Sequence, residues 1–416
     1  MIMAIVAFVV VVVVVGVIGA GTVFDSLTSS PTTTTVPGPL GIYTDQINRA
    51  VAAAEHVLGL NLPTREGKAA PTGLPASMAG VPRHEVLGFV PGYELPHMGP
   101  VDYADFSELV FSAVGVRGTG TLDTSSLGYE EIGYGAAAHL VSSAHAAGVP
   151  VLLSLSQSDQ PTIDQLVSEP AIHAARLAAA VEPMLSANGF DGVDFDIEGQ
   201  NAGESGAFSR FVSAFATDLH AKNSTWSLVV NTYPDSAMSS ETFFDVRSLA
   251  RSAQLFVMAY DMNDFQTPTA TAPLTDAYLS DGTVLASYAA EGLASKTILG
   301  IPFYGYDFAA SKASVPADAL GYPFSVTYDA IIAAGHRALW DPVSETPYTP
   351  FFRHGHWHQT WFDNPMSVAL KTALAAQFHF AGVGAWELGM ASGHPAMSAA
   401  LVDGAPVVKL PLARRS

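Results

Sequence analysis

The chain has 416 residues, of which 49% are hydrophobic, and its mean hydropathy is +0.28, so it can bury a large core and is not disordered over its whole length. Eighteen Lys and Arg against 38 Asp and Glu give a net charge of −20, which argues against nucleic acid and other polyanionic partners and leaves neutral or cationic substrates. The absence of cysteine excludes disulfides, thiolate metal sites and cysteine nucleophiles.

Residues 1–24 contain no charged side chain and include an unbroken valine run from Val9 to Val15. About 20 apolar residues span a bilayer as a helix. The segment is therefore predicted to be an export signal, which contacts the membrane as an anchor if it is not cleaved, and the protein is expected outside the cell or at its surface. A buried valine-rich strand is the alternative.

Residues 25–82 are predicted to form a linker, because they are rich in Ser, Thr, Pro and Gly. One short helix is expected within it, with Thr44 as the N-cap and Gly59 at the end. The compact domain is expected to begin near Arg83 and to run to about residue 405, and residues 406–416 form a tail.

From Arg83 onward, short apolar runs alternate with helical stretches. The runs lie at 86–91, 109–114, 150–155, 192–197, 227–232, 254–260, 297–301 and 382–387. This alternation predicts an α/β fold in which eight parallel strands close into a (β/α)8 TIM barrel. The step from the seventh run to the eighth is much longer, and its surplus, about 307–359, predicts a small α+β insertion between strand 7 and helix 7. His354-Gly355 marks the turn of a β-hairpin within it.

The most informative stretch is the acidic strand that reads GFDGVDFDIE from Gly189. Side chains alternate between the two faces of a strand, so Asp194, Asp196 and Glu198 share one face and the apolar residues between them share the other. In a barrel the apolar face packs on the helices. The three acids then point inward, with Glu198 at the C-terminal mouth, where barrel enzymes build their active sites.

Carboxyl groups spaced about 7 Å apart in a low-dielectric interior repel one another, and at least one pKa must rise. A raised pKa keeps Glu198 protonated near neutral pH, as a general acid for a glycosidic oxygen requires. A solvated acidic face and a carboxylate metal site are the alternatives for this cluster.

The stretch D-G-V-D-F-D-I-E resembles the D-G-x-D-x-D-x-E signature of glycoside hydrolase family 18, the chitinase-like hydrolases. Further resemblances follow in the same order, over about three quarters of the chain. They are Val86-Leu87-Gly88-Phe89 in the first strand, Met258-Ala259-Tyr260-Asp261 at strand six, Gly300-Ile301-Pro302-Phe303-Tyr304-Gly305 at strand seven, Trp361 to Ser367, and Ala385-Trp386-Glu387 at strand eight.

The resemblance implies retaining, substrate-assisted hydrolysis of β-1,4 bonds next to N-acetylglucosamine, in chitin-like chains or peptidoglycan. Glu198 would protonate the leaving oxygen, Asp196 would orient the acetamide, and Asp194 would share a proton with Asp196. Tyr260 would donate a hydrogen bond to the acetamide oxygen, and Asp261 would hold the substrate.

Three apolar residues complete the expected binding site. Trp386 would form the floor under the sugar ring, Met258 would pack below the acetamide methyl group, and Phe89 would be an aromatic residue of the cleft. A role in core packing is the alternative for each of them, and for Tyr260.

No cofactor and no metal are expected. His354, His356 and His358 alternate as strand ligands would, but Gly355 indicates a turn between them. Gly115-Val116-Arg117-Gly118-Thr119-Gly120 lacks the lysine and the helix context of a phosphate loop. The protein is expected to act as a monomer on a glycan.

One segment departs from the family pattern. The third strand usually ends S-x-G-G in this family, whereas here Ser154-Leu155 is followed by Ser156 and Gln157. The change leaves open a second hypothesis, a glycan-binding protein without catalysis. A metal-dependent barrel hydrolase is a third.

Overall fold

The computed structural model describes residues 43–413 apart from 79, 82, 277–278 and 403–408. The expected leader over 1–24, the first part of the linker and most of the tail therefore lie outside the described residues. Within the described part of the chain, no helix combines the length and the apolar character needed to cross a bilayer.

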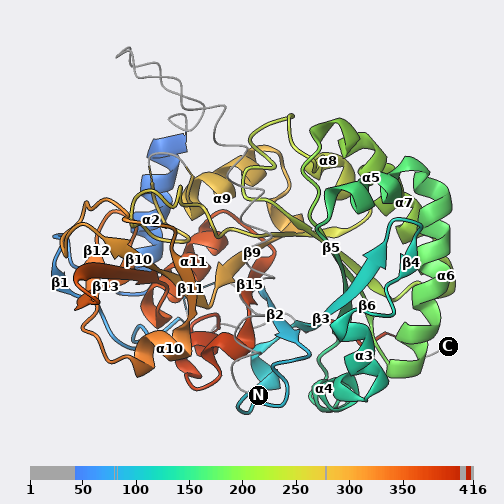
Figure 1. The fold of residues 1–416 in the computed structure, drawn as a ribbon, viewed down its shortest axis with the longest axis horizontal. Helices are drawn as coiled ribbons and strands as arrows, with labels where there is room; N and C mark the ends of the chain where they lie inside the picture. Colours follow the sequence, from blue (N-terminus) through green and yellow to red (C-terminus); the bar gives the residue numbers. More distant parts are fainter. Residues whose placement is uncertain (1–42, 79, 82, 277–278, 403–408, 414–416) are drawn as a thin grey trace.

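Eight parallel strands form a closed barrel (Figure 1). Each pairs in parallel with its neighbours in the order β2-β15-β9-β8-β7-β6-β5-β3, and β3 returns to pair with β2. This confirms the predicted (β/α)8 TIM barrel. The strands are β2 (Glu85–Pro91), β3 (Glu108–Arg117), β5 (Val151–Gln157), β6 (Gly192–Ile197), β7 (Ser227–Thr232), β8 (Gln254–Val257), β9 (Thr297–Pro302) and β15 (Gly382–Trp386). The short β4 (Thr121–Leu122) pairs antiparallel with β3.

Helices surround this barrel and alternate with its strands. They are α3 (Leu127–Gly133), α4 (Ala136–Ala146), α5 (Gln160–Ser168), α6 (Pro170–Asn188), α7 (Ser205–Lys222), α8 (Val246–Leu249), α9 (Asp281–Ala290), α11 (Pro365–Gln377) and α12 (Ala396–Ala399). Single 3-10 turns occur at η2 (Tyr103–Asp105), η3 (Ala202–Glu204), η4 (Ala294–Lys296) and η5 (Leu388–Ala391).

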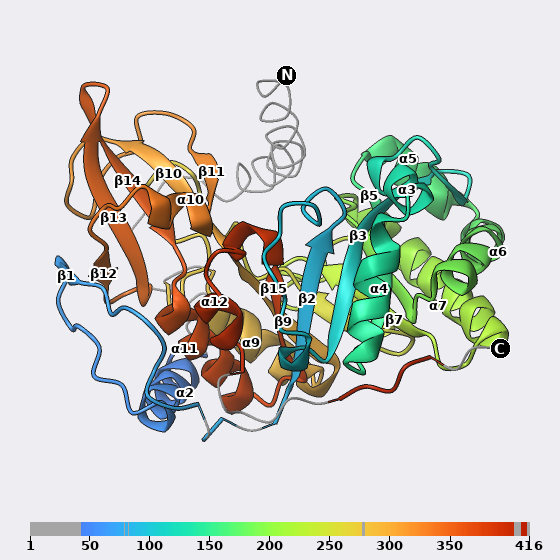
Figure 2. The same cartoon turned by 90° about the horizontal axis from the view of Figure 1, so that it is seen from below.

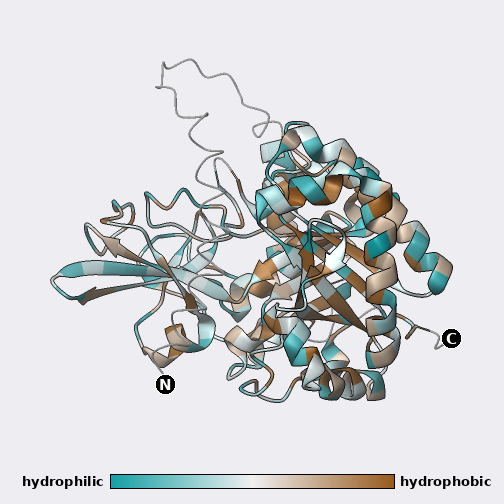
Figure 3. Ribbon diagram, turned by 45° about the vertical axis from the view of Figure 1, so that its right-hand side comes forward, coloured by the Kyte–Doolittle hydropathy of each residue, from teal (hydrophilic) through white to brown (hydrophobic). Residues whose placement is uncertain are grey.

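The barrel has two apolar layers, because its strands are buried on both faces. The larger layer lies between strands and helices. The smaller fills the barrel interior and is built from Leu87, Phe89, Val110, Leu152, Val229, Phe256, Met258 and Ile298. In Figure 3 the apolar colour accordingly concentrates on the barrel strands, whereas the projecting hairpin of the insertion is largely polar.

Strand β6 has the alternation that its sequence predicts. Val193, Phe195 and Ile197 belong to the outer layer, so the acids between them face the interior. Gly192 also faces inward, and a Cβ there would collide with the backbone of Ser227 on the neighbouring strand. Gly189 ends α6 with φ 77°, the left-handed conformation that favours glycine, and turns the chain into the strand.

The insertion after β9 is a lobe built on a six-stranded antiparallel sheet beside the barrel (Figure 2). Five strands of this sheet belong to the insertion, namely β10 (Tyr304–Ala310), β11 (Phe324–Thr327), β12 (Leu339–Asp341), β13 (Thr346–Arg353) and β14 (His356–Phe362), with α10 (Tyr328–Ala333) between β11 and β12. The sixth strand, β1 (Lys68–Ala69), comes from the segment before the barrel. The hairpin β13–β14 turns at His354 and Gly355, both of which have positive φ. The predicted α+β insertion is thus confirmed.

The segment before Arg83 is folded onto both parts. Helix α2 (Thr44–Val57) buries Ile47, Val51 and Ala54 and contacts α9 and α11. Strand β1 (Lys68–Ala69) pairs with β12 at the edge of the lobe sheet. The helix begins at Thr44 with Tyr43 as its N-cap, one residue earlier than expected. The packed structure therefore extends to about Tyr43, whereas composition alone placed its start near Arg83.

Candidate active site

Three acids of one strand converge at the C-terminal mouth of the barrel. Asp194 and Asp196 lie in β6, and Glu198 follows directly after it. The Glu198 amide donates to the Gln157 carbonyl at 2.8 Å, which continues the β5–β6 pairing past the end of the strand. Asp194 is fully buried, while Asp196 and Glu198 are half-buried. The row of three acids therefore runs from the interior of the barrel to its opening.

The two aspartates are joined by a single amide. Asn231 Nδ2, from β7, donates to Asp196 Oδ1 at 3.1 Å and lies 3.5 Å from Asp194 Oδ2. Ser154 Oγ, from β5, donates to Asp194 Oδ2 at 2.7 Å. The other oxygen, Asp194 Oδ1, is buried without a hydrogen-bond partner among the described residues. A proton on Asp194 removes the cost of a buried charge and leaves Asp196 as the ionised member of the pair.

The pKa values follow from burial and mutual repulsion. Burial, together with the charges of Asp196 and Asp261, raises the pKa of Glu198 to about 8. Burial and the Asp196 charge hold the pKa of Asp194 well above its ordinary value. Burial also raises the pKa of Asp196, but the hydrogen bond from Asn231 acts in the opposite direction. Glu198 is therefore protonated at neutral pH, as a general acid must be.

Tyr260 and Asp261 follow β8 and face the same opening. The hydroxyls of Tyr304 and Tyr306 donate to Asp261 Oδ1 at 2.7 and 2.9 Å. The backbone of Asp261 is in the left-handed conformation, φ 55°. Burial and the nearby acids, of which Asp196 contributes most, raise the pKa of Tyr260 well above its ordinary value. Its hydroxyl thus stays neutral and able to donate a hydrogen bond.

The expected apolar residues lie together at the upper end of the barrel interior. The ring of Trp386, half-buried at the end of β15, lies 5.3 Å from that of Phe89, which in turn lies 4.9 Å from Phe256. Met258 belongs to the same cluster and is 9% exposed. Phe89 has no exposed surface, so it supports Trp386 from below rather than lining the opening.

Several residues of the site were not assigned from the sequence. Asn231 and Tyr306 bond to acids of the site that are distant in the sequence, and no motif predicts these contacts. Tyr233 also lies near the acids, because the charges of Glu198 and Asp196 add to burial in raising its pKa. The sequence offered one indication of Asn231: the alternation of side chains along its strand places it on the face that points into the barrel.

The departure in the third strand is accommodated by backbone contacts. The Gln157 side chain donates to the Val116 carbonyl and accepts from the amides of Ser158 and Asp159. Ser156 pairs with Asp196 in the strand register. Gln157 is therefore tied both to the neighbouring strand β3 and to the segment that follows its own strand.

Among the described residues, no set of three or more His, Asp or Glu is placed to hold a metal ion. His356 and His358 stack with ring centroids 4.9 Å apart, and His358 Nδ1 bonds Asp307 at 3.0 Å. His354 lies in the turn of the hairpin.

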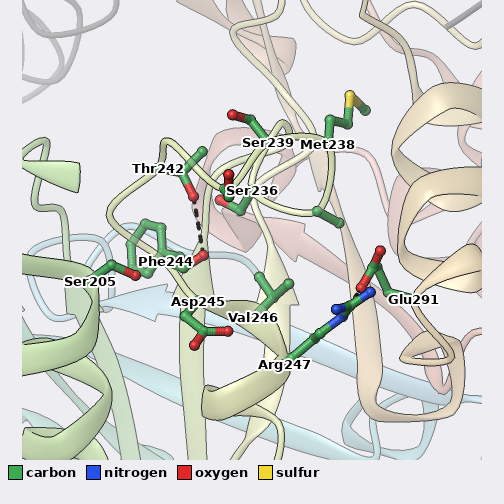
Figure 4. A pocket seen from close by; sticks show the side chains of 12 residues that line it. Ser205, Ser236, Met238, Ser239, Thr242, Phe244, Asp245, Val246, Arg247 and Glu291 are labelled. Carbon is green, nitrogen blue, oxygen red and sulfur yellow. Dashed lines mark hydrogen bonds and ion pairs between the residues drawn. The ribbon is translucent and has the colours of Figure 1, made fainter. Parts of the chain in front are cut away.

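A pocket of about 420 Å³ is lined mainly by the segment between β7 and α8 (Figure 4). Its wall includes Phe244, whose ring lies 5.0 Å from that of Tyr233, and the buried Ser236. The ion pair of Arg247 and Glu291 closes another side. The catalytic carboxylates are not part of its lining, so this pocket is separate from the acid cluster.

A closed parallel barrel with buried, partly protonated carboxyls at its C-terminal mouth defines the protein as a barrel glycoside hydrolase. Residues 87–391 match the family model "Glycosyl hydrolases family 18", and the chain belongs to this family.

Individual relatives are distant but cover much of the chain. Di-N-acetylchitobiase of Mus musculus is 24% identical over 277 residues, which are 58% of this chain and 71% of the relative. A family 18 chitinase from Cycas revoluta, solved in complex with (GlcNAc)3, superposes with a TM-score of 0.68 at 20% identity, over 77% of this chain and 99% of its own. A chitinase-like agglutinin from Robinia pseudoacacia does so with a TM-score of 0.64 at 19% identity, over 76% and 98%.

Proposed function

We propose that the protein hydrolyses β-1,4 glycosidic bonds next to N-acetylglucosamine, in chitin-like chains or peptidoglycan, with retention of configuration and with the substrate's own acetamide as the nucleophile. The observation that carries the proposal is the pairing of a protonated acid with a separate carboxylate. Glu198 has a pKa of about 8, and Asp196 is held toward its ionised form by Asn231.

The first step uses both groups. Glu198 gives its proton to the glycosidic oxygen, and the acetamide carbonyl oxygen attacks the anomeric carbon as the bond to the leaving sugar breaks. The resulting oxazolinium ion carries a positive charge, which the carboxylate of Asp196 stabilises through the acetamide N–H. Asp194 retains the proton shared by the pair, so only one negative charge is buried.

The second step restores the enzyme. Ionised Glu198 takes a proton from water, the hydroxyl oxygen attacks the anomeric carbon, and the oxazolinium ring opens to give back the acetamide. The two inversions give net retention. Tyr260 donates its hydroxyl to the acetamide oxygen, and Trp386 packs beneath the sugar ring.

The names of the relatives agree with this substrate class. The mouse protein is a di-N-acetylchitobiase, and the Cycas revoluta chitinase was solved with a tri-N-acetylglucosamine ligand. The chain-like nature of the substrate and its source are parts of our proposal. So are export through residues 1–24, membrane contact if that segment is retained, and action as a monomer.

A glycan-binding protein without catalysis is the second candidate, and two observations favour it. One of the similar structures is an agglutinin, and the third strand departs from the family pattern at Ser156 and Gln157. Glu198 argues for catalysis, because a binding protein has no need of a buried general acid.

The test is mass detection of products from N-acetylglucosamine oligomers and from peptidoglycan. Glu198→Gln should lower the rate by roughly 10³-fold, within the range that general acid–base catalysis contributes. Glu182→Gln, on the outer helix α6, is the matched control and should retain the rate. Turnover of Glu198→Gln at the wild-type rate would refute the assignment. Binding without turnover of any substrate would favour the second candidate, and loss of activity with a chelator would point to a metal-dependent hydrolase.

A further inference from the structure

Four carboxyl groups from separate elements gather on the side of the mouth that holds Trp386. Glu94 follows β2, Glu131 lies in α3, Asp329 lies at the start of α10, and Glu387 follows β15 directly after Trp386. We propose that this acidic cluster recognises an ammonium group carried by the glycan, either on a deacetylated sugar or on an attached peptide. The inference rests on the proposed function, whose substrate it narrows.

Glu387 is the centre of the cluster. It is fully buried, and its Oε2 accepts a hydrogen bond from the Gly389 amide at 2.8 Å. Its Oε1 has no hydrogen-bond partner among the described residues. A Cβ at Gly389 would lie 2.8 Å from Glu94 Cγ and 3.1 Å from Glu387 Oε2, so the two acidic side chains flank the same glycine.

Tyr93 brings a third acid into the group. Its phenol is 40% exposed, and the charges of Glu387, Glu94 and Glu131 add to burial in raising its pKa. Glu131 lies against the backbone of Gly92, where a Cβ would overlap its carboxylate. The three acids therefore lie near enough to one partly exposed aromatic side chain for their charges to act on it.

Asp329 closes the cluster from the insertion lobe. Its carboxylate accepts from the Gly393 amide at 3.1 Å and from Ser392 Oγ at 3.3 Å. His394 Nε2 lies 3.8 Å from it. Asp329 and Glu94 both contribute to the raised pKa of Glu387, so their charges reach the buried carboxyl.

Histidines are the basic groups near the cluster: the charge of His97 opposes the rise in the pKa of Glu94, and His394 lies 3.8 Å from Asp329. In the described part of the chain, the lysine and arginine ion pairs join other acids, namely Arg117 with Asp123, Arg247 with Glu291, and Lys371 with Asp281 and Asp363. Burial raises the pKa of Glu131 to about 7 and that of Glu387 to about 8. An ammonium group would favour the ionised form of these carboxyls and would relieve their mutual repulsion.

The contacts would come from the half-buried side chains. Glu94, Glu131 and Asp329 are each partly exposed and could contact the ammonium group. Glu387 is fully buried and would attract it through its negative charge alone. Because Glu387 follows Trp386 in the chain, the ammonium group would lie next to the ring that stacks on the tryptophan. A neutral N-acetylated unit offers no such charge, and an anionic substituent would be repelled.

The test compares cationic and neutral substrates in one assay. The ratio of their kcat/KM values is measured at about pH 7, where the side-chain amines of a peptide stem are protonated. One arm sets a partially deacetylated chitin oligomer against its fully N-acetylated form, and the other sets a peptide-bearing muropeptide against the same molecule with its amines acetylated. These arms distinguish the sugar amine from the peptide amine.

Glu94→Gln and Glu131→Gln should each lower the ratio by about three- to fivefold in at least one arm, as half-exposed charge pairs do. Glu130→Gln, on the neighbouring exposed position of α3, is the matched control and should leave the ratio unchanged. Raising the salt concentration should lower the wild-type ratio.

Equal ratios in wild type and in both variants, with thermal midpoints unchanged, would overturn the inference while the hydrolase assignment stands. Absence of turnover on every substrate would instead refute the proposed function.

Discussion

The hydrogen bond from Asn231 controls the acid limb of the pH–rate profile. Asn231 Nδ2 donates to Asp196 Oδ1 at 3.1 Å and so favours the ionised carboxylate that catalysis requires. Replacing Asn231 with Ala removes this donor. The pKa of Asp196 is already raised by burial, and it must rise further when the bond is lost.

The size of the shift follows from the strength of the bond. A hydrogen bond to a charged group contributes about 1.5–3 kcal/mol, and we take the lower end because Asp196 is half-buried. One pKa unit corresponds to about 1.4 kcal/mol. The acid limb of kcat/KM should therefore move upward by about one pH unit, so that the variant loses activity at low pH and recovers it near neutrality.

The assay is the pH dependence of kcat/KM on an N-acetylglucosamine oligomer, together with the thermal midpoint of each variant. The alkaline limb serves as an internal control, because Asp196 is still ionised where Glu198 titrates. Asn188→Ala is the matched control, since the Asn188 amide donates to the Met184 carbonyl at the end of α6 and no bond from it to the acids is present among the described residues. An acid limb that stays in place in a folded Asn231→Ala protein would refute the reasoning.

Four further outcomes are expected. The kcat/KM should fall above about pH 8 as Glu198 loses its proton. Asp261→Asn should move this alkaline limb of the profile to lower pH, because the Asp261 charge helps to raise the pKa of Glu198. The pH dependence of kcat/KM measures both outcomes. Lys371→Met should destabilise the protein by about 3–5 kcal/mol in denaturant unfolding at pH 8, because it leaves fully buried carboxylates unpaired, and by less below about pH 7, where Asp281 is protonated. Trp386→Ala should raise KM by about tenfold with a smaller change in kcat, as judged by steady-state kinetics.

The orientation of the side chains in the acidic strand β6 could be predicted from the local sequence pattern. Alternation along one strand was enough to place Val193 and Phe195 on the helices and Asp194 and Asp196 in the interior, because the period of two is a property of the backbone itself. The aromatic assignment was less complete. Phe89 resembled a cleft residue, but the closed barrel buries it beneath Trp386.

Hydrogen-bond partners on different strands could not be predicted from the sequence. Asn231 lies 35 positions from Asp196, and Tyr306 lies 45 positions from Asp261. Neither pair has a spacing that a motif records, because the first depends on the pairing of β6 with β7 and the second on a contact between β10 of the lobe and the segment after β8. The composition of residues 43–70 was also misleading, since their burial depends on the lobe sheet and on α11, which come much later in the chain.

The sequence by itself determined the alternation of strands and helices, the inward face of the acidic strand and the family to which these motifs belong. These depend on periodicity and on short contiguous patterns. The tertiary structure alone decided which amide bridges the aspartates and which acids lie near Tyr93. Each of these depends on burial and on charges from distant segments, and such terms act only once the barrel has closed.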